Sequence, residues 1–139
     1  DEQLGKLSFV SALFPEATLV FGESSVETFA VPVSGGVVVH AWSEQEPYMS
    51  WRTSSQQVIS VSAGEVMGVY HGNGDERLVQ VRRDDGLTCL YGNLAEAFVQ
   101  PGDQVHAGTC LGLLMPDADC VFELRDDGRS IDPGSFFAR

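Results

Sequence analysis

The sequence predicts an all-β, β-rich fold: a single antiparallel β-sandwich or open barrel with an irregular N-terminal segment. Three observations predict it. The chain has 139 residues, 43% of them hydrophobic, which is enough for one domain with a core. Its 15 glycines and many valines form short apolar runs between turn residues. Turn signals recur about every eight to twelve residues without a long helical period, which is typical of sandwiches and barrels.

The N-terminal part divides into an extension and the start of the domain. Residues 1–28 have apolar residues at mixed spacing and are interpreted as an extension with a short helix or strand. The domain is assigned to residues 29–139. It is expected to begin with a strand over Phe29–Val33, a turn over 34–36 and a second strand over Val37–Trp42.

The middle of the chain alternates between loop and strand signals. Residues 43–57 are polar and loop-like, whereas the valines of residues 58–70 predict a strand pair with Gly64 in its turn. Asn73-Gly74 is a strong signal for a tight hairpin turn, because both central positions of that turn need positive φ. The returning strand is expected over residues 77–83.

The last third continues as a series of hairpins with no helical pattern. Its expected turns and strands are, in order, a turn at Asp84–Gly86, a strand over residues 87–94, a turn at Pro101-Gly102, a short strand around Val105, a turn at Gly108, a further strand, and a closing strand over residues 119–126. No apolar run of about 18 residues occurs, so the sequence contains no membrane-spanning helix.

The net charge is strongly negative. Twenty acidic residues face eight basic ones, which gives −12 at pH 7. This charge argues against nucleic acid as a partner and disfavours anionic membranes and wall polymers. A neutral or basic protein partner is compatible with it.

The three cysteines have no C-x-x-C spacing, which argues against a zinc knuckle or a redox pair. Cys110 and Cys120 flank a stretch that could form a hairpin and could therefore pair in a disulfide. Cys89, Cys110 and Cys120 as free thiols are the favoured alternative.

An ordered set of residues in the second half of the chain matches a known pattern. The set is Gly86, Leu87, Thr88, Tyr91, Leu94, Gly102, Asp103, Gly108, Gly112, Phe122, Glu123, Arg125, Asp132 and Pro133. In this order it resembles the LytM/lysostaphin-type zinc endopeptidases (metallopeptidase family 23), and the match runs from Pro32 to Phe137. The resemblance implies the duplicated hybrid motif fold of that family.

The positions that carry chemistry in that family differ here. Family members hold zinc through an H-x-x-x-D stretch and the second histidine of an H-x-H stretch, and two more histidines assist. At the ligand positions this chain has Ser54, Val58 and Val121, and at the assisting positions it has Asn93 and Asp119. Valine cannot bind a metal. The resemblance and these departures together imply that no zinc is bound and that the domain is not an enzyme.

The segment before the first ligand position is similar to the stage II sporulation protein Q branch of the family, in its "PVSGG", its "EP" followed by tyrosine, and its "WRT". That similarity implies an extracytoplasmic domain, anchored through an N-terminal membrane helix, that acts as a scaffold for a mother-cell membrane sporulation protein in an intermembrane channel. Trp42, Tyr48 and Trp51 are candidate contacts for a protein partner or a glycan, with ordinary packing as the alternative.

A second hypothesis belongs to a different class. The family contains degenerate members that activate cell-wall amidases, and a vacant groove could also bind peptidoglycan. The chain is therefore interpreted as an interaction scaffold, with an amidase activator or a peptidoglycan-binding module as the alternative. Peptidoglycan itself is not favoured as a partner.

Overall fold

The computed structural model describes residues 28–137, which form ten strands and one short helix. The elements are β2 (Val37–His40), β3 (Met49–Arg52), β4 (Gln57–Ile59), β5 (Gly64–His71), β6 (Arg77–Arg82), β7 (Leu87–Ala97), β8 (Gln104–Val105), β9 (Cys110–Leu114), β10 (Cys120–Asp126), β11 (Arg129–Ile131) and α1 (Gly134–Phe137). The extension expected over residues 1–28 lies outside the described residues except for Thr28.

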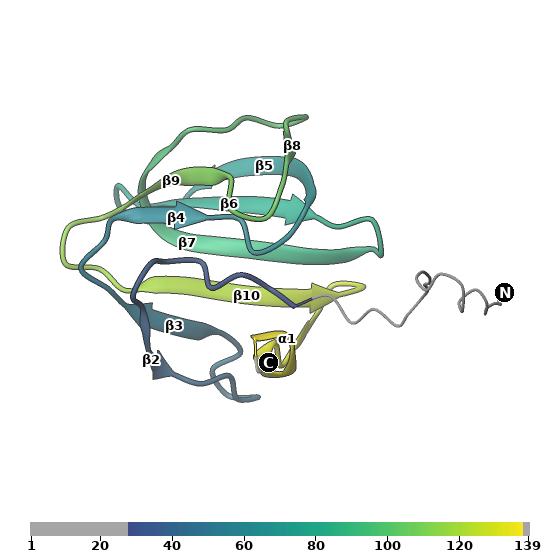
Figure 1. Cartoon of the computed structure of the whole chain (residues 1–139), viewed down its shortest axis with the longest axis horizontal. Helices are drawn as coiled ribbons and strands as arrows, with labels where there is room; N and C mark the ends of the chain where they lie inside the picture. The colour runs from purple at the N-terminus through teal and green to yellow at the C-terminus, as the bar shows by residue number, and fades with distance from the viewer. Residues whose placement is uncertain (1–27, 138–139) are drawn as a thin grey trace, which may run out of the picture.

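The strands form one open antiparallel sheet in the order β2-β3-β10-β7-β6-β5-β8. Strand β11 pairs with β10, while β9 pairs with both β7 and β4. Figure 1 shows β2 at the lower border of the sheet, with β3 between it and β10. Every strand pair is antiparallel, so the all-β prediction is confirmed.

The core lies on one face of β10 and its neighbours. Successive side chains of a strand point to opposite faces, and Cys120, Phe122 and Leu124 of β10 are all fully buried. The Phe122 ring packs edge-to-face on Tyr91 and Trp51, with centroid distances of 5.3 and 6.3 Å. These aromatic contacts connect β10 to β7 on one side and to β3 on the other.

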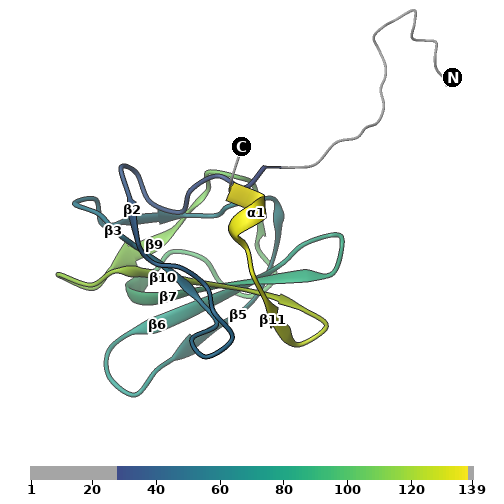
Figure 2. The ribbon, with the colours of Figure 1, turned by 90° about the horizontal axis from the view of Figure 1, so that it is seen from below.

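The two ends of the described chain meet beside this core. The first described residues lie next to α1 in both Figure 1 and Figure 2. The Phe29 amide donates to the Phe136 carbonyl at 2.9 Å, and the two rings stack at 4.6 Å. Asp132 accepts a hydrogen bond from the Gly134 amide at 2.8 Å and so positions the start of α1.

Tyr91 fixes the segment before β5. Its hydroxyl accepts a hydrogen bond from the Val61 amide at 2.9 Å and lies 3.5 Å from the Ser60 hydroxyl. The phenol is fully buried, and this desolvation raises the pKa of Tyr91 well above its ordinary value. Tyr91 is therefore a structural anchor between β7 and the chain that enters β5.

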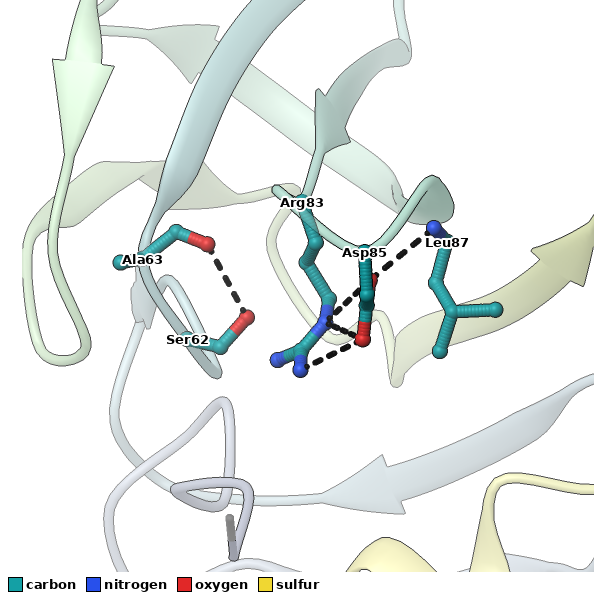
Figure 3. Close-up of polar contacts among 5 residues, drawn as sticks. All are labelled: Ser62, Ala63, Arg83, Asp85 and Leu87. Atoms are coloured by element: carbon teal, nitrogen blue, oxygen red, sulfur yellow. Dashed lines mark hydrogen bonds and ion pairs between the residues drawn. The ribbon is translucent and has the colours of Figure 1, made fainter.

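The turn between β6 and β7 forms as predicted and is held by an ion pair (Figure 3). Arg83 donates to the Asp85 carboxylate at distances between 2.9 and 3.2 Å, and the Leu87 amide donates to the same carboxylate at 3.1 Å. The hydrogen bond from Arg83 lowers the pKa of Asp85. Gly86 has φ of 91°, which a residue with a side chain rarely adopts. Arg83 also lies 5.1 Å from the centroid of the Phe29 ring.

The structure corrects two predictions near the start of the domain. Residues 29–33 are not a strand, because their backbone groups bond to separate segments: Ala30 N donates to Val61 O, and Pro32 O accepts from Ile59 N. The polar loop expected over residues 43–57 contains β3, whose first three residues are buried. Because both faces of β3 are covered, its sequence does not show the alternation of apolar and polar residues that identifies a half-exposed strand.

Two turn predictions also need correction. Strands β5 and β6 form the expected hairpin, but neither Asn73 nor Gly74 has positive φ. The loop is wider, because the Gly72 amide bonds to the Glu76 carbonyl at 2.9 Å. Gly64 begins β5 instead of forming a turn, and β4 pairs with β9 rather than with β5. A Cβ at Gly64 would lie 2.6 Å from the Arg82 carbonyl oxygen, so close strand approach explains this glycine.

The cysteines are free thiols. The hairpin considered between Cys110 and Cys120 does not form, because β9 pairs with β4 and β7, whereas β10 pairs with β3, β7 and β11. Burial raises the pKa of the Cys120 thiol to about 12. Within residues 28–137, no helix is long and apolar enough to cross a membrane.

Candidate functional site

Two of the positions where the zinc chemistry was expected, Asp119 and Val121, lie at the start of β10. Val121 points away from the core between the buried Cys120 and Phe122. It is paired with Gly92 of β7 on one side and with Ser50 of β3 on the other. The outer face of the central sheet is thus lined by small and apolar residues at this point.

The next outward position, Asp119, is held by two neighbours. Arg52 donates to its carboxylate at 3.1 and 3.3 Å, and this hydrogen-bonded pair raises the pKa of Arg52 further. The Asn93 side-chain amide donates to the Asp119 backbone carbonyl at 2.9 Å, and Asn93 has φ of 67°. The two residues expected at the positions of the assisting histidines are therefore in contact with each other.

The remaining pair of ligand positions is divided between surface and core. Ser54 is exposed on the loop between β3 and β4. Val58 lies in β4, opposite Gly112 of β9, and is completely buried in the hydrophobic core. The two positions therefore do not face one common site.

Two hollows flank the contact between Asn93 and Asp119. The larger, of about 620 Å³, lies between residues 52–56 and residues 114–119, and Ser54 and Asp119 line it. The smaller, of about 360 Å³, has Asn93 and Val121 in its lining. Its other lining residues are Tyr70, His71, Gly72, Glu76, Arg77, Leu78 and Gly92. The structure thus distributes the positions of the expected centre over two separate hollows and the core.

The donor set does not fit a zinc ion. A protein zinc site needs three or four nitrogen, sulfur or carboxylate ligands around one point. Val58 and Val121 have no donor atom, and the Asp119 carboxylate is paired with Arg52. Within residues 28–137, no three His, Cys, Asp or Glu side chains gather closely enough to hold a metal.

The three candidate contact aromatics have different surroundings. Trp51 is only 2% exposed and packs on Phe122, so in this fold it presents no surface to a partner. Trp42 is half-buried, and its indole N–H donates to the Ser130 hydroxyl at 3.0 Å. Tyr48 is half-buried and lies against the His40 ring, with centroids 4.3 Å apart. Trp42 and Tyr48 therefore remain candidates.

Sequence reasoning missed an exposed apolar stretch in the described part of the domain. Val37, Val38 and Val39 of β2 are 65%, 47% and 43% exposed. Strand β2 is at the border of the sheet, where β3 is its one partner strand among the described residues. The sequence did contain a signal for this surface. Successive side chains of a strand point to opposite faces, so three consecutive valines in a border strand cannot all lie on one buried face.

The comparisons with known proteins agree with this geometry. The model of peptidase family M23 matches residues 48–133. No curated protein matches the sequence.

Three solved structures illustrate the similarity in fold. Lysostaphin from Staphylococcus simulans has 16% identity and a TM-score of 0.66, covering 82% of this chain and 54% of that one. Csd3 from Helicobacter pylori has 16% identity and a TM-score of 0.71, and the match covers 81% of this chain and 34% of the Csd3 chain. A chain of the SpoIIQ–SpoIIIAH pore-forming complex has 21% identity and a TM-score of 0.65, and the match covers 81% of this chain and 92% of that chain. The chain spans half or less of the length of the first matching structures, a lysostaphin structure, a Vibrio cholerae peptidase and Csd3.

Proposed function

The chain belongs to peptidase family M23, and on that premise we propose that its domain is a non-catalytic scaffold for protein–protein interaction. The observation that carries the proposal is the filling of the expected metal positions. Val121 and Val58 offer no ligand atom there, and Arg52 neutralises the carboxylate of Asp119. A peptidase of this type needs three ligands and an open position for water, and these side chains provide neither.

Strand β2 supplies a binding surface for such a scaffold. One of its borders pairs with β3, and its other border faces no strand of the described part of the chain. The free N–H and C=O groups of a border strand can pair with a strand of another protein. The three exposed valines would add apolar contact, and Trp42 and Tyr48 lie in the segment that connects this strand to β3. The charge of −12 favours a basic partner and discourages self-association.

The similarity to SpoIIQ supports a proposal for the partner and the location. SpoIIQ has been solved in complex with SpoIIIAH, and this chain covers 92% of the matched chain of that complex. We therefore propose that the domain is extracytoplasmic, is anchored through an N-terminal membrane helix, and docks on a mother-cell membrane sporulation protein. No zinc cofactor is expected in this role.

The test is binding to the ectodomain of the SpoIIIAH-like protein of the same organism. We expect saturable binding by calorimetry, weakened at least tenfold by Val38→Lys, because a charge on the exposed border strand opposes strand addition. Phe98→Ser is the matched control, since Phe98 is also apolar and 54% exposed but lies just after β7, away from β2. Cleavage of muropeptides by the purified chain would contradict the proposal.

One observation favours the alternative, an amidase activator or peptidoglycan-binding module. The larger hollow is lined by Thr53, Ser54, Ser55 and Gln56, whose hydroxyl and amide groups suit a glycan or a peptide stem. Co-sedimentation with purified peptidoglycan separates the two proposals. A pure protein scaffold stays in the supernatant, whereas a wall-binding module pellets with the polymer.

A further inference from the structure

We infer that the smaller hollow is a pocket for one large apolar side chain, leucine or similar in size, from a basic segment of the partner protein. This inference rests on the proposed function, because it assumes a protein partner. It assigns a binding role to the place where the peptidase pattern expects a metal ligand. We define the apolar pocket by four residues of its lining: Tyr70, Leu78, Gly92 and Val121.

One wall of the apolar pocket leaves space for a ligand because it contains a glycine, Gly92. Gly92 and Val121 are register partners in β7 and β10. A Cβ added at Gly92 would lie 3.7 Å from the Val121 Cβ and would meet no other atom closer than that. The absence of a side chain at Gly92 therefore leaves room beside Val121 that a ligand side chain can occupy, and a larger residue would fill it.

The opposite wall is fixed in position. Tyr70 and Leu78 are register partners in β5 and β6. The Tyr70 ring lies over Gly68 of its own strand, where a Cβ would collide with the ring, and its hydroxyl donates to Gln80 at 3.1 Å. Tyr70 is nevertheless 49% exposed. A preoriented, half-exposed aromatic ring loses little conformational freedom when a ligand packs on it.

The polar side chains at the rim are already engaged by other groups. The Asn93 amide donates to the Asp119 carbonyl at 2.9 Å, and Arg77 donates to the Ala95 carbonyl at 2.6 Å. Glu76 accepts from the Gly74 amide at 3.1 Å. Apart from His71, the polar side chains of the lining therefore bond within the protein, and apolar contact is the main favourable interaction left for a ligand side chain.

Charge identifies the kind of partner. Glu76 and Arg77 of the lining have opposite charges, Asp75 lies beside them in the loop, and the whole chain carries −12. A second copy of the chain would bring the same charge and be repelled. Lysine or arginine next to the inserted side chain would instead be attracted to this loop. The occupant is thus a basic segment of another protein.

The experiment is an NMR titration of the full 139-residue chain with the tripeptide N-acetyl-Lys-Leu-Lys-amide. The Gly92 amide and the Asn93 side-chain amide report directly on the apolar pocket. We expect saturable shifts of both signals at millimolar peptide. N-acetyl-Lys-Ala-Lys-amide should bind about tenfold more weakly or worse, because it buries three fewer carbon atoms. N-acetyl-Glu-Leu-Glu-amide should produce no saturable shift.

Variants make the result specific. Val121→Asp should abolish the shifts by placing a charge in the apolar pocket, and Gly92→Val should do so by filling it. The second variant keeps the test valid if the first does not fold, since an added Cβ at Gly92 meets only ordinary contacts. Phe98→Ser is the control and should bind the tripeptide as the unmodified chain does.

The outcomes separate this inference from the proposed function. Absence of saturable shifts at Gly92, or equal affinity for the leucine and alanine peptides, overturns the apolar pocket. In that case, if the unmodified chain binds the partner protein and the β2 variant Val38→Lys does not, the scaffold proposal stands without the apolar pocket. Specific tripeptide binding together with failure to bind any protein partner supports the apolar pocket and contradicts the scaffold.

Discussion

The two faces of strand β10 differ in what their residues do. On the inner face, Cys120, Phe122 and Leu124 are fully buried and connect to the aromatic core. On the outer face, Val121 borders the apolar pocket and Glu123 forms an ion pair with Arg125 at 3.0 Å. One strand therefore carries the packing of the domain on one side and borders the proposed apolar pocket on the other.

This difference explains how the frame can persist when outward residues such as Asp119 and Val121 change. Side chains of a strand alternate between faces, so changes at every second residue leave the core packing intact. The inner residues determine whether the sheet forms, and the outer residues determine what it can bind. We expect stability and binding to respond to separate sets of substitutions.

The largest effect is expected on the inner face. Phe122 contacts Tyr91, Trp51 and Phe29, so Phe122→Ala should lower the free energy of unfolding by roughly 3–5 kcal/mol. Val121→Ala is the matched control one residue away, and it should cost less than about 1 kcal/mol because its side chain is half-exposed. Urea denaturation of both variants measures the difference, and equal losses would contradict the separation of the two faces.

A smaller effect is expected at the hydroxyl that anchors the segment before β5. Tyr91→Phe leaves the buried Val61 amide without its acceptor, which should cost roughly 1–3 kcal/mol. Tyr70→Phe is the control, because that hydroxyl bonds to Gln80 at an exposed position. If both variants unfold at the same denaturant concentration as the unmodified chain, Tyr91 is not an anchor.

The ion pair at the β6–β7 turn should make stability depend on pH. The pKa of Asp85 is lowered by its hydrogen bond from Arg83, so its contribution is fully present above its unfolded-state pKa of about 3.9. That contribution is lost as the pH falls through the lower folded-state pKa. We expect Asp85→Asn to be modestly less stable at pH 7 and to show a shallower loss of stability below about pH 4. Thermal unfolding between pH 2 and 7 measures both slopes, and parallel curves would exclude this role.

The smallest effect on stability is expected at the outer pair of Arg52 and Asp119. Both side chains are on the surface, where solvent screening weakens an ion pair. Arg52→Gln should leave the melting temperature nearly unchanged in 0.15 M salt. A large drop in melting temperature would mean that this outer ion pair stabilises the fold as much as residues of the inner face do.

The sequence was informative where a local rule acts alone. The buried Val79 and Val81 of β6, the turn at Gly86 and the closing strand through Phe122 follow from alternation and turn chemistry. The short strand β3 was missed because its pairing with β2 and β10 depends on residues distant in the sequence. The prediction of a tight turn at Asn73-Gly74 was wrong, because His71 pairs with Arg77 and residues 72–76 form a longer loop.

The candidate site was predictable only in part. The loss of ligand atoms at Val58 and Val121 is readable from the residue types. The burial of Trp51 and the pairing of Asp119 with Arg52 depend on how β3 lies against β10, which no local pattern encodes. The apolar pocket likewise requires β5, β6, β7 and β10 to be placed side by side.

Isothermal titration of the full chain with zinc at pH 7 tests the central claim most directly. The outer face of β10 offers valine where a ligand is needed, so we expect no saturable zinc binding at micromolar concentrations. Tight binding of one zinc ion per chain, abolished by substituting residues beside Val121, would contradict the account.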